Sequence, residues 1–229
     1  MAILKNAYLR TVIFATLLAV TLYFTIFHTC SAIAAEVKKF EKANIVVEQN
    51  FTDDDAEIVI FAKGIDEGLA KLKVFGPSGT EILRLSVYDK ILGVREFAVE
   101  SAEPNVTDVL NAYPAGRYRF EGLTISGIRL EAVGNLSHVL PKPVVVEMDK
   151  TSGKVSWTPV SGVKGYRLEF EREVKGQDVL KLTLDLPSSV TDFQVPKVFL
   201  GPGDYQVGIA AISRNGNIVV VEKEFSINK

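Results

Sequence analysis

The chain has 229 residues, of which 47% are hydrophobic and 24% are charged, and its formal net charge is −2. This composition excludes a disordered chain and provides enough apolar material for two cores of roughly 100 residues each. The slightly acidic balance argues against nucleic acid as the main partner.

The N-terminal segment has the pattern of a secretory signal. Lys5 and Arg10 are followed by a charge-free run over residues 11–35, with the small residues of Ala32-Ile33-Ala34 near its end. This order is typical of a cleaved signal peptide, so residues 1–35 are expected to form a signal helix. The alternative is an uncleaved transmembrane anchor, because a charge-free run of about 20 residues can span a bilayer. We therefore expect a secreted or periplasmic protein, or one that residues 11–35 anchor to a membrane.

Loss of residues 1–35 would leave 24 basic and 28 acidic residues, a net charge of −4. It would also remove Cys30, the only cysteine of the sequence, so the exported chain would have no disulfide and no thiolate ligand. His138 would be its only histidine. These counts exclude the cysteine and histidine zinc sites, and we expect no cofactor.

Residues 36–140 are predicted to form a β-rich domain. Residues 69–75 and 81–87 alternate apolar and polar side chains, and Gly76-Pro77-Ser78-Gly79 between them predicts a tight hairpin turn. Asn105 or Thr107 is a candidate cap for one or two helical turns within residues 104–112. Further strands are expected at residues 45–47, 57–61, 94–99, 116–120 and 127–131.

The strands at residues 116–120 and 127–131 have two different faces. Alternation directs Tyr118 and Phe120 into the core, together with Ile128 and Leu130. It directs three arginines to the outer face, which we interpret as a solvated surface: Arg117, Arg119 and Arg129.

Pro141-Lys142-Pro143 predicts a linker, because two prolines cannot donate ladder hydrogen bonds and stiffen the chain. Residues 144–229 then form a second domain, for which seven short strands indicate a β-sandwich. Asn215-Gly216 predicts the hairpin between its last two strands. The predicted fold class is all-β, with two β-sandwich domains in tandem after the signal helix. The expected strands of the second domain are residues 144–148, 154–158, 166–174, 179–186, 192–195, 205–213 and 218–227.

Three segments of the second domain match a known family. Residues 155–159 (Val-Ser-Trp-Thr-Pro), 165–169 (Gly-Tyr-Arg-Leu-Glu) and 200–207 (Leu-Gly-Pro-Gly-Asp-Tyr-Gln-Val) resemble strands B, C and F of a fibronectin type III domain. The resemblance implies that Trp157 and Tyr166 belong to the core between two sheets. It also implies a tyrosine corner, in which the hydroxyl of Tyr205 bonds back to the backbone.

The loop between the last two strands is Arg-Asn-Gly-Asn over residues 214–217, where adhesive members of this family can carry Arg-Gly-Asp. The resemblance therefore gives no support to integrin-type adhesion. Residues 113–120 repeat the order of Pro, Gly and Tyr found at residues 202–205. The whole exported chain resembles bacterial secreted proteins in which a β-rich domain precedes one fibronectin type III domain, and this implies an architecture without a particular chemistry.

Candidates for chemistry are few. His138 is the only histidine that could serve a Ser-His-Asp hydrolase, and the adjacent Ser137 would point to the opposite face of a strand. Residues 53–55, three consecutive aspartates, could bind calcium with Asp66 or Glu67, but calcium loops place their ligands at alternate positions. We interpret these aspartates as a solvated turn, and we assign no catalytic and no metal-binding residue.

Tyr88, Phe97, Tyr113 and Phe193 could form a platform for stacking sugars, but alternation favours core positions for most aromatic residues. We therefore predict a non-enzymatic binding or structural module that recognises a protein or an envelope component such as a polysaccharide. A carbohydrate-binding accessory protein is the alternative, and a secreted hydrolase is the third candidate. The sequence identifies no ligand-binding residues.

Overall fold

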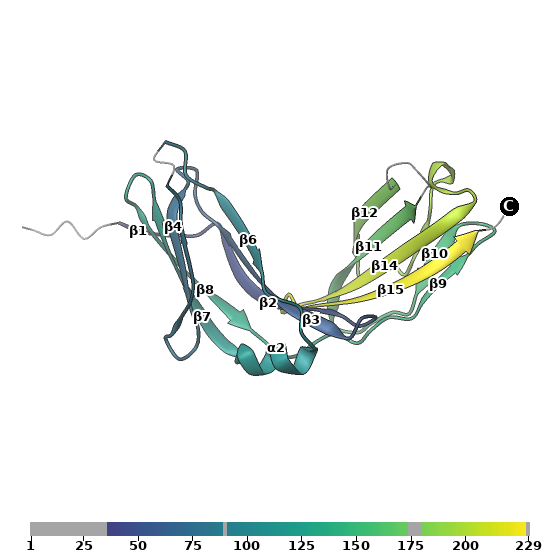
Figure 1. Ribbon diagram of the computed structural model, residues 1–229, viewed down its shortest axis with the longest axis horizontal. Coiled ribbons are helices and arrows are strands. Elements are labelled where there is room, and N and C mark those ends of the chain that lie inside the picture. Colours follow the sequence, from purple (N-terminus) through teal and green to yellow (C-terminus); the bar gives the residue numbers. More distant parts are fainter. Residues whose placement is uncertain (1–35, 89–90, 174–179, 228–229) are drawn as a thin grey trace, which may run out of the picture. The chain divides into compact units, whose positions relative to one another are not determined.

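The computed structural model describes residues 36–88, 91–173 and 180–227 (Figure 1). The predicted signal helix of residues 1–35, with Cys30, lies outside these ranges. Among the described residues, no helix is long and apolar enough to cross a bilayer. Strands predominate in the described part of the chain, which has one α-helix and one short 3-10 helix, and this confirms the predicted all-β fold class.

The first sandwich is built from two sheets that enclose one core. A three-stranded part consists of β2 (Lys42–Asn50), β3 (Asp55–Lys63) and β6 (Glu96–Glu100). The opposite sheet has the order β1-β8-β7-β4-β5, and its strands are β1 (Val37–Lys39), β4 (Leu69–Phe75), β5 (Glu81–Ser86), β7 (Gly116–Thr124) and β8 (Arg129–Leu136).

Local sequence explains most of these elements. β4 and β5 alternate inward and outward side chains as predicted, and Gly79 adopts the positive φ of +84° that the turn between them requires. Helix α2 (Val106–Ala112) begins where expected, because the side chain of Asn105 accepts a hydrogen bond from the backbone N–H of Asp108. β1 was not predicted, because three residues that include two lysines show no strand pattern. β1 forms because it pairs in parallel with β8.

The second sandwich has the seven strands that the sequence predicted, and a 3-10 helix η1 (Lys197–Phe199) in addition. One sheet has the order β13-β10-β9, from β9 (Val146–Asp149), β10 (Lys154–Trp157) and β13 (Asp192–Gln194). The other has the order β12-β11-β14-β15, from β11 (Val163–Glu173), β12 (Leu180–Pro187), β14 (Gly203–Ser213) and β15 (Ile218–Ile227). The turn after Ser213 contains Gly216 with a φ of +97°, so the predicted hairpin is confirmed.

Large aromatic side chains fill the two interiors. Tyr118 and Phe120 are completely buried in the first core. In the second core, Trp157 is 5% exposed and meets Tyr166 edge-on, with ring centroids 5.6 Å apart. Tyr205 is buried against Phe170, with ring centroids 5.4 Å apart. The five aromatic residues named from the sequence as core therefore have interior positions.

Each sandwich contains a tyrosine corner. The hydroxyl of Tyr118 donates to the carbonyl of Pro114 at 2.9 Å, and the hydroxyl of Tyr205 donates to the carbonyl of Gly201. The Tyr205 hydroxyl also accepts the backbone N–H of Gly201 at 2.8 Å. Both hydroxyls thus tie the start of a strand to the loop before it.

We expect Tyr118→Phe and Tyr205→Phe each to lower the free energy of unfolding by about 1–2 kcal/mol, because each leaves a loop carbonyl without its donor. Urea unfolding followed by circular dichroism measures the effect. Tyr88→Phe is the control, since Tyr88 is 91% exposed and should unfold like the wild type. Two variants that match the control would show that the corners contribute no stability.

One sheet runs through both sandwiches. β15 pairs with β2 in parallel, with Ile218 opposite Glu48 and Val220 opposite Asn50, which completes the order β12-β11-β14-β15-β2-β3-β6. The predicted linker at residues 141–143 lies between the last residues of the first core and the first of the second. The division into domains at that linker stays a prediction, because the shared sheet connects the two cores independently of it.

Asn217 connects the two sandwiches by hydrogen bonds where β15 meets β2. It is 1% exposed, and its Nδ2 donates to the carbonyls of Ser137 at 2.7 Å and Val139 at 3.0 Å. Its Oδ1 accepts the backbone N–H of Val47 at 3.0 Å, so one side chain connects β2, the segment before the linker and the start of β15.

Asn217→Ala is expected to cost about 3 kcal/mol of unfolding free energy, because it leaves the N–H of Val47 and the carbonyl of Ser137 without partners, whereas the carbonyl of Val139 keeps the Nδ2 of Asn215 as a donor. Urea unfolding measures this cost, and limited proteolysis within residues 137–143 should become faster. Asn135→Ala is a matched control on an exposed position of β8. Wild-type stability and proteolysis in Asn217→Ala would contradict the proposed fastening.

Candidate functional site

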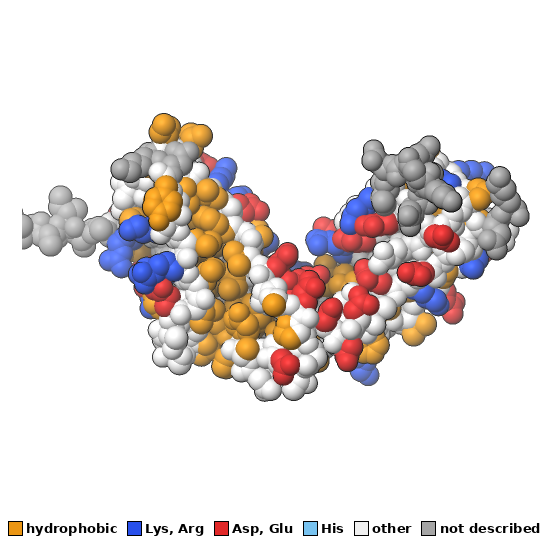
Figure 2. All heavy atoms as spheres, viewed as in Figure 1, with side chains coloured by type: hydrophobic (Ala, Val, Ile, Leu, Met, Phe, Trp, Pro, Cys, Tyr) orange, Lys and Arg blue, Asp and Glu red, His pale blue; other side chains and the backbone are white. Residues whose placement is uncertain are grey.

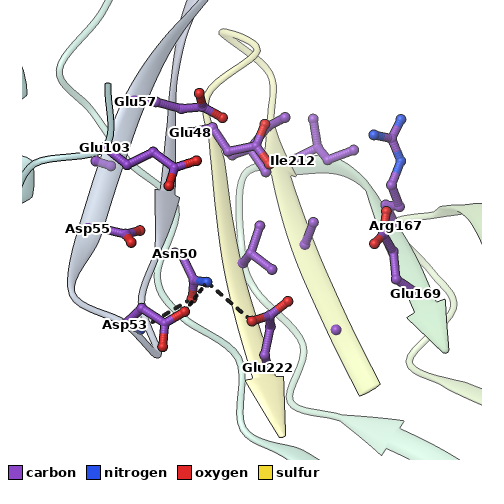
Figure 3. Close-up of a pocket in the computed structure, with 15 residues that line it drawn as sticks. Glu48, Asn50, Asp53, Asp55, Glu57, Glu103, Arg167, Glu169, Ile212 and Glu222 are labelled. Carbon is purple, nitrogen blue, oxygen red and sulfur yellow. Dashed lines mark hydrogen bonds between the residues drawn. The ribbon is translucent and has the colours of Figure 1, made fainter. Parts of the chain in front are cut away.

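The outer face of the seven-stranded sheet is hollowed where the two sandwiches share it (Figure 3). The hollow has a volume of about 250 Å³. Its floor is apolar and contains no aromatic side chain; it consists of Gly208, Ala210, Ile212, Ile218 and Val220. We call it the acidic groove, because its borders carry the carboxylates of Glu48, Asp53, Asp55, Glu57, Glu103, Glu169 and Glu222, with the cation Arg167.

Strand register explains how this groove is assembled. Side chains alternate between the two faces of a strand, so residues directly opposite each other share a face. Ile218 lies opposite Glu48, and Glu48 lies opposite Glu57 on β3. The apolar floor on β15 is therefore continued by a carboxylate row on β2 and β3.

The two borders of the groove differ in charge balance. On the β11 side, the Nε of Arg167 is 2.9 Å from the Oδ1 of Asp185, and Glu169 pairs with Lys181 at 3.4 Å. On the β2 side, neither Glu48 nor Glu57 has an ion-pair partner within the ranges that the structure describes. Negative charge is therefore least compensated along β2 and β3.

Glu57 is the most strongly perturbed acid of the groove. Burial, and after it the repulsion from neighbouring carboxylates with Glu100 and Glu48 before the others, together raise its pKa from 4.5 to about 7. Its Oε2 is buried and has no hydrogen-bond partner in the described part of the chain. Burial also raises the pKa of Glu48, an effect that Arg167 opposes. At neutral pH, Glu57 therefore holds a proton more readily than an exposed glutamate does.

The groove also contains a small hydrogen-bonded cluster. The Nδ2 of Asn50 donates to the Oδ2 of Asp53 at 2.9 Å and to the Oε2 of Glu222 at 3.2 Å (Figure 3). The hydroxyl of Thr52 accepts the backbone N–H of Glu222 at 2.8 Å. The turn that holds the consecutive aspartates is thereby joined to β15.

A second charged surface lies on the opposite sheet of the first sandwich. Figure 2 shows Lys and Arg side chains gathered near β1 and β4, and acidic side chains over β2, β3 and β15. We call the outer face of the sheet β1-β8-β7-β4-β5 the basic face. Its cations outnumber its carboxylates, with Lys39, Lys71, Lys73, Arg84, Arg117, Arg119 and Arg129 against Glu81, Glu121 and Glu131.

The carboxylates of the basic face are all engaged by its cations. Glu81 pairs with Arg84 at 2.6 Å and with Lys73 at 3.7 Å, Glu121 pairs with Arg119, and Glu131 pairs with Arg129 at 3.9 Å. Lys71 and Arg117 form no ion pair among the described residues. The arginines that the sequence placed on an outer face thus belong to a surface with surplus positive charge.

The other sequence candidates do not assemble into a site. The Nε2 of His138 hydrogen-bonds to the carbonyl of Tyr113 at 2.8 Å, while the Oγ of Ser137 accepts the N–H of Val139 at 3.1 Å. Asp66 pairs with Arg95 at 2.9 Å, away from the three aspartates. Over residues 36–88, 91–173 and 180–227, no group of three or more His, Cys, Asp or Glu is placed to hold a metal ion.

The four aromatic residues considered for sugar stacking lie in different places in the structure. Phe97 and Tyr113 pack partly buried against the first core, and Phe193 packs against the second. Tyr88 is 91% exposed. These four rings therefore do not form a common platform.

The strand orders identify the fold of both sandwiches. In each, a three-stranded group, β2-β3-β6 or β9-β10-β13, faces a group ordered β5-β4-β7-β8 or β12-β11-β14-β15. The fold is fibronectin type III-like. The sequence indicated this fold for the second sandwich alone. The order of Pro, Gly and Tyr at residues 202–205, which recurs within residues 113–120, was the signal that could have indicated the same fold for the first sandwich. Both of these tyrosines form the corners described above.

No family model matches the chain, and no curated protein does. Among solved structures, the FN1–FN3 domains of chicken CNTN1 have 12% identity and a TM-score of 0.38, covering 85% of this chain and 65% of that one. A tetra-tandem repeat in the extending region of a large adhesion protein has 14% identity and a TM-score of 0.31, and the match covers 82% of this chain and 50% of that one. A two-domain fibronectin type III segment of chicken tenascin also has 14% identity and a TM-score of 0.31, and the match covers 83% of this chain and 100% of that one.

Proposed function

We propose that this chain is an exported, non-enzymatic binding module that recognises a protein of the cell envelope. The acidic groove carries this proposal, because it is a hollowed sheet face with an apolar floor and uncompensated charge at its border. Aromatic side chains fill the interiors of both sandwiches, so a partner would meet the chain on an outer face.

The lining favours a protein partner over a polysaccharide. Lys and Arg side chains combine an apolar stem with a charged end, and such a side chain can lie on the floor while its charge reaches the carboxylates. Neutral sugars are bound largely by stacking on aromatic rings, and no aromatic ring is among the residues that line the groove.

Capture from the native envelope with the full chain, followed by chemical crosslinking, tests this function. The double variant Glu169→Lys, Glu222→Lys reverses two charges at the groove. The amount of partner that it captures should be at least tenfold lower than with the wild type. Lys150→Glu, on the exposed turn after β9, is the control and should capture as the wild type does. Equal capture by the groove variant, or a catalytic activity that His138→Ala abolishes, would overturn the proposal.

A further inference from the structure

We infer that the basic face of one copy of this chain docks on the acidic groove of a second copy, in a head-to-tail contact; this rests on the proposed function and names the partner protein. Both surfaces are outer faces of sheets that no other described element covers. Their charges are opposite, which is the condition for specific association of charged surfaces.

The basic face supplies what the groove lacks. Lys71 and Arg117 have no ion-pair partner among the described residues, as is the case for Glu48 and Glu57 of the groove. The net charge of the chain is −2, so a surface with surplus positive charge is opposite in sign to the molecule as a whole. A second copy therefore offers a complementary partner for each surface.

Apolar side chains on both surfaces can form the centre of such a contact. On the basic face, Leu123 lines a shallow hollow of about 220 Å³ beside Lys71, Lys73 and Arg129. Phe75 lies beneath the guanidinium of Arg119, 4.1 Å from ring centroid to Cζ. The floor of the groove is likewise apolar. An apolar centre with a charged rim is the usual composition of a protein interface.

The two surfaces cannot meet within one copy. The basic face is the outer face of β1-β8-β7-β4-β5, whereas β2 and β3 contribute to the groove from the opposite sheet of the same sandwich. The outer faces of two packed sheets point in opposite directions. The contact is therefore heterologous, and each added copy leaves one groove and one basic face available, so assembly continues into chains.

Sedimentation velocity with the full chain and two complementary variants tests the inference. The basic-face variant carries Lys71→Glu and Arg117→Glu, and the groove variant carries Glu169→Lys and Glu222→Lys. The wild type should form a concentration-dependent series of oligomers at about 50 mM salt that weakens at about 500 mM, because salt screens exposed charges. Each variant alone should be monomeric, with its association constant lowered at least tenfold.

An equimolar mixture of the two variants gives the decisive result. Each variant keeps the surface that the other has lost, so the mixture should form a 1:1 dimer and no larger species. Lys150→Glu should assemble as the wild type does. Circular dichroism of each variant establishes that it is folded.

Absence of the 1:1 dimer, or a wild type that stays monomeric at about 100 µM in low salt, would overturn the inference. Retention of the wild type, but not of the basic-face variant, on an acidic polysaccharide column without any dimer would assign the basic face to a polyanion instead. If the wild type does not self-associate but the groove variant captures less envelope partner than the wild type, this inference is wrong and the proposed function is supported.

Discussion

Replacing Glu57 with Gln is expected to stabilise the folded chain by about 1 kcal/mol at pH 8, with a much smaller gain at pH 5. Burial and like charges raise the pKa of Glu57 from 4.5 to about 7 in the folded chain. In a fully buried group, a shift of that size corresponds to about 3 kcal/mol, and the partial exposure of this side chain to solvent reduces the expected effect.

The sign follows from the direction of the shift. The folded state binds the proton more tightly than the unfolded state, so wild-type stability falls as the pH rises from about 4.5 through about 7. Gln is neutral at every pH and removes this dependence. The difference between Glu57→Gln and the wild type should therefore grow with pH.

Urea unfolding at pH 5 and pH 8 measures the difference. Glu147→Gln is the matched control, because Glu147 is exposed on β9 and lies outside the groove. We expect the unfolding free energy of this control to equal that of the wild type at both pH values. A gain in Glu57→Gln that is equal at pH 5 and pH 8 would show that packing, not charge, sets the effect.

Trp157→Ala is expected to lower the free energy of unfolding by about 3–5 kcal/mol, the largest change among these variants. Trp157 is buried between the sheets of the second sandwich and contacts Tyr166 edge-on. Alanine would leave a cavity that the surrounding strands can close only in part.

Trp157→Phe separates packing from hydrogen bonding. The Nε1 of Trp157 is buried without an acceptor among the described residues, so its removal recovers part of the energy that the smaller ring loses. We expect a cost of about 1–2 kcal/mol for this variant. Trp157 is the only tryptophan, and unfolding must therefore be followed by circular dichroism instead of fluorescence. Equal stability of the Ala and Phe variants would contradict a core role for the ring.

The sequence by itself determined most strands other than β1, the turns and the direction of most side chains. Alternation along β4 and β7 is a local property, because successive side chains of a strand point to opposite faces whatever its neighbours are. It therefore predicted the buried Tyr118 and Phe120 and the outward Arg117 and Arg119. The position of Asn105 likewise predicted the start of α2, since capping involves residues next to each other in the chain.

Only the tertiary structure decided which strands are neighbours. The pairing of β15 with β2 joins residues about 170 positions apart, and periodicity contains no signal for such a pair. The acidic groove depends on this pairing, because it combines carboxylates of β2 and β3 with a floor from β14 and β15. Asn217 was visible as part of a hairpin turn, but its three hydrogen bonds to distant backbone exist only once both cores have packed. Alternation specifies which face a residue occupies, whereas long-range packing specifies what lies beside it.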